Sequence, residues 1–182
     1  MAQAHPDEGE APIIVSLAEA AMHMYVSAID SLPHHEDLEF PRRVEVILSG
    51  LRKLQVSLTE AAGRSRTTPA VIVALSEVRR QYDDLMGRAA AAPGSTLGQR
   101  LYVARRRARI SAQEAANGVG LRADLLDDLE AGEIPTEDEA VKVKQLIEAL
   151  GGSPEMAAAA FHHRPDPETL DESMAWNGSD VG

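Results

Sequence analysis

Residues 97–152 read LGQRLYVARRRARISAQEAANGVGLRADLLDDLEAGEIPTEDEAVKVKQLIEALGG, and this stretch decides the fold. It contains two capping boxes, at Ser111-Ala-Gln-Glu114 and at Thr136-Glu-Asp-Glu139. In a capping box the hydroxyl and the carboxylate each satisfy a backbone N–H group at the start of a helix. The two boxes therefore predict that one helix begins after Ser111 and another after Thr136.

Glycine residues mark the ends of the helices in the same stretch. Gly118-Val-Gly120 is predicted to form a tight turn, and Gly132 is predicted to stop the helix that follows this turn. Ser153-Pro-Glu opens a further short helix, which is predicted to close near Phe161. The sequence should thus form five short helices, over about 96–109, 111–117, 122–131, 136–150 and 153–161.

The residues before this stretch also carry apolar side chains at helical spacing. From Pro12 to about Ser31 the chain is apolar on nearly every side, which predicts a well-buried helix. Residues 41–62 and 69–91 carry apolar residues at steps of four and three, the heptad pattern. Joined by a short turn, these two helices should pack as an antiparallel hairpin. The first helix would either cover this hairpin or pair with another copy of the chain. A plain three-helix bundle and a dimerisation module both fit this pattern.

These patterns together predict an all-α fold in four parts. Residues 1–11 and the acidic tail 163–182 are expected to be disordered, because they are polar and lack a periodic apolar face. Residues 12–92 are expected to form a helical bundle that contains the heptad hairpin. Residues 93–162 are expected to form a five-helix domain.

Composition and motifs argue against enzymatic chemistry. The 182 residues include no cysteine, which excludes disulfides, thiolate metal sites and cysteine nucleophiles. The sequence shows no phosphate-binding glycine loop and no nucleophile motif. The histidine pairs at 34–35 and 162–163 lie in predicted loops or helix ends, where neighbouring rings point in different directions. We therefore expect no enzyme activity, no cofactor and no metal site.

The N-terminal sequence predicts a cytoplasmic protein without a membrane partner. Its first ten residues, MAQAHPDEGE, are acidic and lack the basic stretch that begins a signal peptide. The longest apolar stretch, near residues 12–29, is interrupted by polar side chains such as Ser16, Glu19 and His23. Such interruptions make it a poor membrane span.

The pattern of helix starts and ends over residues 96–161 resembles that of the Cro and lambda-repressor type of helix-turn-helix domain, often called Xre-like. The resemblance covers about a third of the chain, while residues 1–92 and the tail resemble no family. The matching features are Leu97-Gly98-x-Arg100-Leu101 at the start of the first helix, Ser111 before the second, Gly120 at the turn, Glu130-x-Gly132 at the end of the third, and Ala149-Leu150-Gly151 at the end of the fourth.

This resemblance implies a DNA-binding transcription regulator that acts as a homodimer through residues 12–92. The third helix of such a domain enters the major groove, and the start of the second helix lies beside it. The implied base-reading positions are Ala112, Arg122, Ala123, Asp124, Asp127 and Asp128. Arg122 is the best candidate for a base contact, because a guanidinium can bind guanine through two hydrogen bonds. The best phosphate candidates are Ser111, Gln113, Arg105 and Arg106.

The resemblance also implies a structural salt bridge. In the family an arginine of the first helix often pairs with a glutamate at the end of the third, and the matching residues here are Arg105 and Glu130. Because an unpaired buried charge is costly, losing either partner should destabilise the domain.

The distribution of charge works against DNA binding. The net charge is −11, and between Ser111 and Glu139 nine acidic side chains surround a single basic one, Arg122. DNA affinity comes largely from neutralising phosphates. Dimer avidity could compensate, or the arginines of residues 100–109 could hold the phosphates while the acidic residues face away. Alternatively, the fold could serve as a protein-interaction module whose acidic third helix binds a basic partner.

Overall fold

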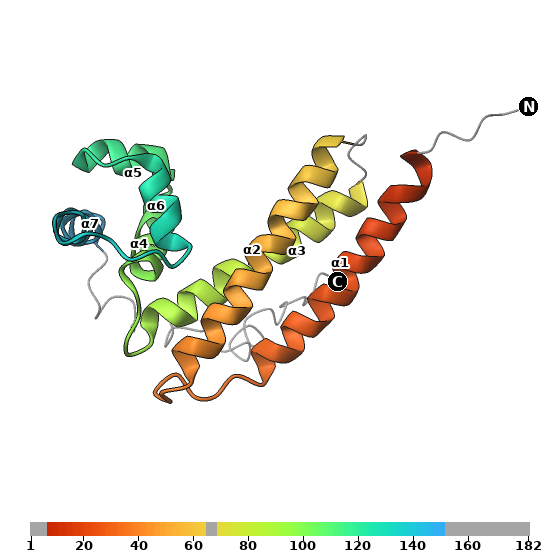
Figure 1. The fold of residues 1–182 in the computed structure, drawn as a ribbon, viewed down its shortest axis with the longest axis horizontal. Coiled ribbons are helices and arrows are strands. Elements are labelled where there is room, and N and C mark those ends of the chain that lie inside the picture. The colour runs from red at the N-terminus through yellow and green to blue at the C-terminus, as the bar shows by residue number, and fades with distance from the viewer. Residues whose placement is uncertain (1–6, 65–68, 152–182) are drawn as a thin grey trace, which may run out of the picture.

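A three-helix bundle is followed in the chain by a smaller unit of four short helices (Figure 1). The computed structural model describes residues 7–64 and 69–151, whose regular structure is entirely α-helical. The predicted all-α fold is confirmed. The predicted helix at 153–161 and the predicted disordered tail at 163–182 lie outside the described residues. The helices are α1 (Asp7–Asp30), α2 (Phe40–Arg64), α3 (Pro69–Ala91), α4 (Leu97–Ala108), α5 (Ala112–Val119), α6 (Ala123–Glu130) and α7 (Glu137–Ala149).

Helices α2 and α3 form the antiparallel hairpin that their heptad spacing predicts (Figure 1). Their apolar residues face each other in one core, in which Val44, Leu51, Val78 and Leu85 are fully buried. Full burial of one such side chain stabilises a fold by about 1.5–3 kcal/mol. The bounds of α3 agree with the prediction, and α2 is slightly longer than the predicted 41–62.

Helix α1 begins earlier than the sequence predicts. It starts at Asp7, so residues 7–11, which were expected to be disordered, belong to the helix. Pro12 is favoured in the first turn of a helix and was therefore expected to mark its start. The helix nevertheless runs through Pro12, whose missing N–H group leaves the carbonyl of Glu8 without its usual helical partner.

Helix α1 is also less buried than the sequence predicts. Ala18 and Met22 pack into the core, but Ile13, Leu17 and Met24 are 61%, 66% and 66% exposed. The hairpin can cover only one side of a helix, and an all-round apolar sequence leaves the other side uncovered. Among the described residues, Ile13–Asp30 is also the one helical stretch long and apolar enough to cross a membrane by length and composition.

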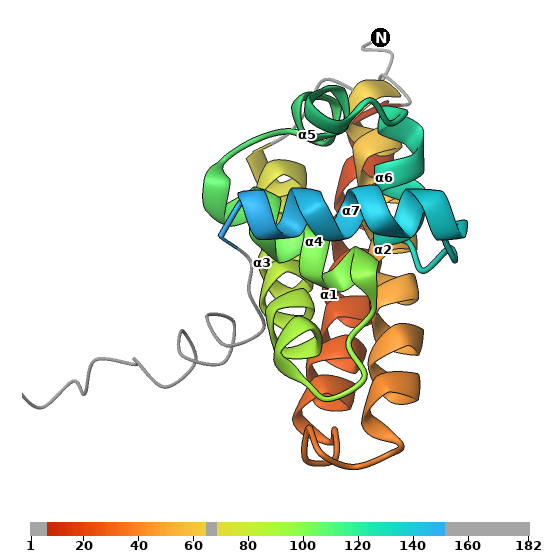
Figure 2. The ribbon, with the colours of Figure 1, turned by 90° about the vertical axis from the view of Figure 1, so that its left-hand side faces the viewer.

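Helices α4 to α7 enclose a second apolar core. Leu101 of α4, Leu126 and Leu129 of α6 and Val143 of α7 are fully buried in it. Helix α7 lies across α4 and closes one side of the core (Figure 2). Small side chains on α5, Ala115 among them, let α5 lie close to α6. This core positions the short helices that the sequence places at the candidate site.

The turn between α5 and α6 begins later than predicted. Helix α5 continues to Val119, so Gly118 lies within its last turn and not in a tight turn. Gly120 takes a left-handed conformation, with φ of 64°, and its N–H group bonds to the carbonyls of Ala116 and Asn117. Glycine favours this conformation because it has no Cβ atom, and it ends helices in this way.

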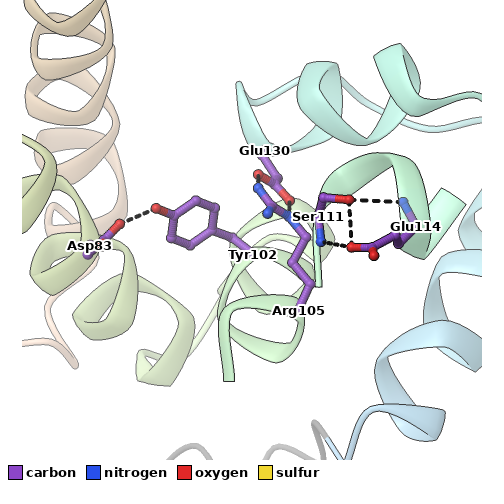
Figure 3. Close-up of polar contacts among 6 residues, drawn as sticks. All are labelled: Asp83, Tyr102, Arg105, Ser111, Glu114 and Glu130. Carbon is purple, nitrogen blue, oxygen red and sulfur yellow. Dashed lines mark hydrogen bonds and ion pairs between the residues drawn. The ribbon is translucent and has the colours of Figure 1, made fainter. Parts of the chain in front are cut away.

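The bundle and the second core meet where α3 contacts α4. The rings of Tyr82 and Tyr102 pack edge to face, with centroids 5.5 Å apart. The Tyr102 hydroxyl donates a hydrogen bond to Asp83 (Figure 3). The Arg106 guanidinium pairs with the second oxygen of the same carboxylate. Burial raises the pKa of Tyr102, so its hydroxyl stays protonated and able to donate. One carboxylate of the bundle thus holds two side chains of α4.

Candidate nucleic-acid interface

Helices α5 and α6 form a pair joined by the three residues Gly120, Leu121 and Arg122. A reciprocal capping box starts α5, as predicted (Figure 3). The Ser111 hydroxyl accepts from the backbone N–H of Glu114 at 3.2 Å, and the Ser111 N–H donates to the Glu114 carboxylate at 2.8 Å. The backbone hydrogen bond from Ser111 lowers the pKa of Glu114 below its usual value of 4.5. The Ser111 hydroxyl is therefore already engaged in capping.

The ion pair implied by the family resemblance, between Arg105 and Glu130, is present (Figure 3). Two guanidinium nitrogens of Arg105, Nε and Nη2, donate to the two carboxylate oxygens of Glu130. The side chains are only 13% and 7% exposed, and the Tyr102 ring centroid lies 5.2 Å from the guanidinium carbon. Burial raises the pKa of Glu130, and the Glu130 carboxylate raises the pKa of Arg105. The pair ties the end of α6 to α4.

This geometry corrects one sequence expectation, that Arg105 could contact a DNA phosphate. Both donor groups of Arg105 that form the pair are turned inward, and little of the side chain reaches solvent. Rotating it outward would leave the Glu130 carboxylate buried without its charged partner, at a cost of several kcal/mol. Arg105 is a structural residue in this fold. Of the predicted phosphate candidates on α4, Arg106 alone is exposed, and it pairs with Asp83.

A glycine allows α4 to approach α6 at backbone distance. A Cβ atom placed on Gly98 would lie 1.8 Å from the carbonyl oxygen of Leu129. Helix α4 begins with a third capping box, formed by Thr96 and Gln99, which was not predicted although its spacing is visible in the sequence. Gly98 and the Arg105–Glu130 pair therefore hold α6 against α4 at two points.

The predicted base-reading residues divide into two groups. Arg122, Asp124, Asp127 and Asp128 are exposed on α6 or at its start, as a reading surface requires. Ala112 and Ala123 are partly buried, and their methyl groups contact the second core. These two alanines contribute mainly to helix packing. The accessible surface of α6 is therefore one arginine followed by three aspartates.

Arg122 does not stand free on this surface. Its Nη1 atom lies 2.7 Å from Oδ2 of Asp124, and the two side chains are 69% and 64% exposed. Exposed ion pairs are worth about 0–1 kcal/mol, so this pair can open readily. Gln113, the remaining candidate, is exposed on α5 and donates to the side chain of Asn117 at 3.0 Å.

Two further residues position this unit and were missed from the sequence. Asp83 holds Tyr102 and Arg106, and Arg52 of α2 donates to the Glu130 carbonyl at 3.5 Å. Both contacts join residues far apart in the chain. Helical spacing places Tyr102 and Arg106 on one side of α4, but it does not reveal their partner.

The fold and the site define an all-α protein in which a three-helix bundle carries a four-helix unit with an exposed short helix, α6. The chain belongs to the family of a protein of Mycolicibacterium smegmatis (strain ATCC 700084 / mc(2)155) that is described as uncharacterized. The two are 63% identical over 129 residues, which are 71% of this chain and 100% of that protein. A family model described as MSMEG_6518_N, an N-terminal domain, matches residues 25–96. That match spans part of α1, all of α2 and α3, and the residues leading into α4. No solved structure matches the chain.

Proposed function

We propose that the protein is a DNA-binding transcription regulator that acts as a homodimer, with α5, the turn at Gly120 and α6 as its helix-turn-helix. One observation carries the proposal. The buried Arg105–Glu130 pair fixes α6 against α4, and the outer side of α6 is open to solvent. A short exposed helix held in this way is what a major groove accepts. The resemblance of residues 96–161 to repressor-type domains supports the same reading.

The side chains on α6 favour a particular kind of base contact. Arg122 lies at the N-terminal end of α6, where a recognition helix meets base edges. An arginine can donate to O6 and N7 of guanine, and a carboxylate such as that of Asp124 can accept from N4 of cytosine. Opening the exposed Arg122–Asp124 pair would free both groups. The proposed operator half-site therefore contains a G·C pair opposite the start of α6.

The test of this proposal is selection of a DNA site followed by a salt series. The full-length protein should select a site from a random duplex library, and the affinity should fall steeply as salt rises. Arg122→Ala should cost about 1–3 kcal/mol of binding free energy and relax the preference at one base pair. The matched control is Arg80→Ala, which removes a similarly exposed, ion-paired arginine from α3 (61% against 69% for Arg122). If the wild-type protein selects no site at low salt, the proposal fails.

The proposed homodimer uses the uncovered side of α1. Ile13, Leu17, Ala20 and Met24 are exposed on it at steps of four, three and four, a heptad stripe. Glu19 is the only charged side chain between residues 13 and 29, so two copies can approach here with little repulsion despite the overall negative charge. Pairing would cover the apolar side that the hairpin leaves exposed.

Leu17→Asp should convert the dimer to a monomer in sedimentation equilibrium, because it places a charge in the centre of the stripe. It should also weaken operator binding by about 100-fold or more, through lost avidity. Val46→Asp is the control, since Val46 is equally exposed (69%) but lies on α2. A wild-type protein that is already a monomer contradicts the dimer. Wild-type binding to phosphatidylcholine vesicles that Leu17→Asp abolishes would instead identify a lipid surface as the partner.

A protein-interaction module is the second candidate, and one observation favours it. Arg122 is neutralised by Asp124, so Asp127 and Asp128 give the exposed side of α6 a negative charge. A surface of this kind attracts a basic peptide and repels phosphate. Asp127→Asn/Asp128→Asn distinguishes the two functions: it should strengthen DNA binding under the first proposal and weaken binding of a basic partner under the second.

A further inference from the structure

A cleft rich in arginine lies where α4 meets α3. It opens to solvent and has a volume of about 570 Å³. The lining of this arginine cleft includes Asp83, Tyr102, Val103, Arg106, Arg107 and Arg109. Three guanidinium groups against one carboxylate leave the lining with an excess of positive charge, in a chain whose net charge is −11.

Two of the three arginines are free to bind an anion. Arg106 pairs with Asp83, but within residues 7–64 and 69–151 the guanidinium groups of Arg107 and Arg109 have no ion-pair partner. Arg109 is also the one non-glycine residue in that part of the chain with a positive φ, of 58°. This conformation ends α4, because Arg109 is the C-cap and its N–H group bonds to the carbonyls of Arg105 and Arg106.

The chain carries a segment with complementary charge. Residues 166–180, which lie outside the described residues, read DPETLDESMAWNGSD and hold five acidic side chains and no basic one. Fourteen residues lie between Gly151 and Asp166, and this stretch can span up to about 50 Å. Helix α4 has 12 residues and is therefore about 18 Å long. Because α7 packs against α4, the segment can reach the cleft from the end of α7.

We propose that the acidic segment 166–180 binds in the arginine cleft of the same chain. Its carboxylates would pair with Arg107 and Arg109, and its apolar side chains, Trp176 among them, would lie against Val103 and Tyr102. Arginine also stacks favourably on a tryptophan ring. A DNA backbone supplies negative charge but no large apolar side chain, and it lacks the high effective concentration of a tethered segment. The acidic segment therefore fits the arginine cleft better than DNA does, because the lining of the cleft is both positively charged and apolar.

The test uses the full-length protein without DNA. Because the chain has no cysteine, Ser173→Cys gives a single site for a nitroxide spin label. At low salt the label should selectively reduce the amide NMR signals of residues 103–109, and high salt should restore them. Arg107→Ala/Arg109→Ala should abolish the signal loss, whereas Arg107→Lys/Arg109→Lys should largely keep it. Arg42→Ala/Arg43→Ala, which removes two exposed arginines of α2, is the control and should change nothing.

Three results would overturn the proposal. The label could leave residues 103–109 unaffected at low salt, or it could reduce signals elsewhere in the molecule. The third is a signal loss that survives Arg107→Ala/Arg109→Ala. If that variant instead lowers DNA affinity while the label never approaches the cleft, the DNA backbone is the occupant and the segment is not. Since the NMR measurement contains no DNA, failure of the proposed regulator function would not affect it.

Discussion

Glu130→Ala should destabilise the four-helix unit by about 3–5 kcal/mol. The substitution leaves the Arg105 guanidinium, which is 13% exposed, without the carboxylate that receives both of its hydrogen bonds. It also frees the end of α6 from α4. Urea unfolding followed by circular dichroism measures the loss, and amide NMR signals should show that it is confined to α4–α7.

Two variants separate loss of the charge pair from loss of packing. Arg105→Met/Glu130→Leu replaces the whole pair with apolar side chains and should be close to the wild type in stability, since no buried charge remains. Asp124→Ala breaks the exposed pair with Arg122 and should change stability by less than about 1 kcal/mol. A Glu130→Ala protein as stable as Asp124→Ala would show that the buried pair does not hold α6 in place.

Gly98→Ala should prevent α4 and α6 from packing together. The added Cβ would lie 1.8 Å from the carbonyl oxygen and 2.4 Å from the carbonyl carbon of Leu129. These are backbone atoms, so relief requires a whole helix to move. The loss should reach or exceed the roughly 1–3 kcal/mol typical of overpacked cores. Thermal unfolding and loss of amide signal dispersion in α4–α7 provide the measurement.

Gly118→Ala is the matched control for this glycine. A Cβ at Gly118 meets nothing within 4 Å, and the residue lies inside α5 without a positive φ. Alanine favours a helix over glycine by about 0.8–1.0 kcal/mol, so this variant should be as stable as the wild type or more stable. Equal melting temperatures for the Gly98→Ala and Gly118→Ala proteins would contradict the close contact at Leu129.

Local signals allowed much of the fold to be predicted from the sequence. Capping boxes located the starts of α5 and α7, and heptad spacing predicted the hairpin of α2 and α3. These features act over three to seven residues, so they can be seen in a single sequence. The burial of α1 could not be predicted in the same way. An apolar residue such as Leu17 is compatible with either side of the helix, and only the fold decides which side the hairpin covers.

The candidate site was predictable in its residues and less so in its geometry. The family resemblance implied the pair between Arg105 and Glu130, but it also offered Arg105 as a phosphate contact, and one side chain cannot fill both roles. Ala112 was assigned to the reading surface because of its position in the motif, although its methyl group partly faces the core. Whether a side chain points outward depends on the crossing of α5 and α6, which sequence spacing does not specify.

The carboxylate of Asp83 has a mechanical consequence for the molecule. Because Asp83 binds both Tyr102 and Arg106, it couples the orientation of α4 to that of α3 across the short link between the two helices. The bundle and the four-helix unit are thus joined at this contact as well as through the chain. A rotation of the long helices should therefore also move α6.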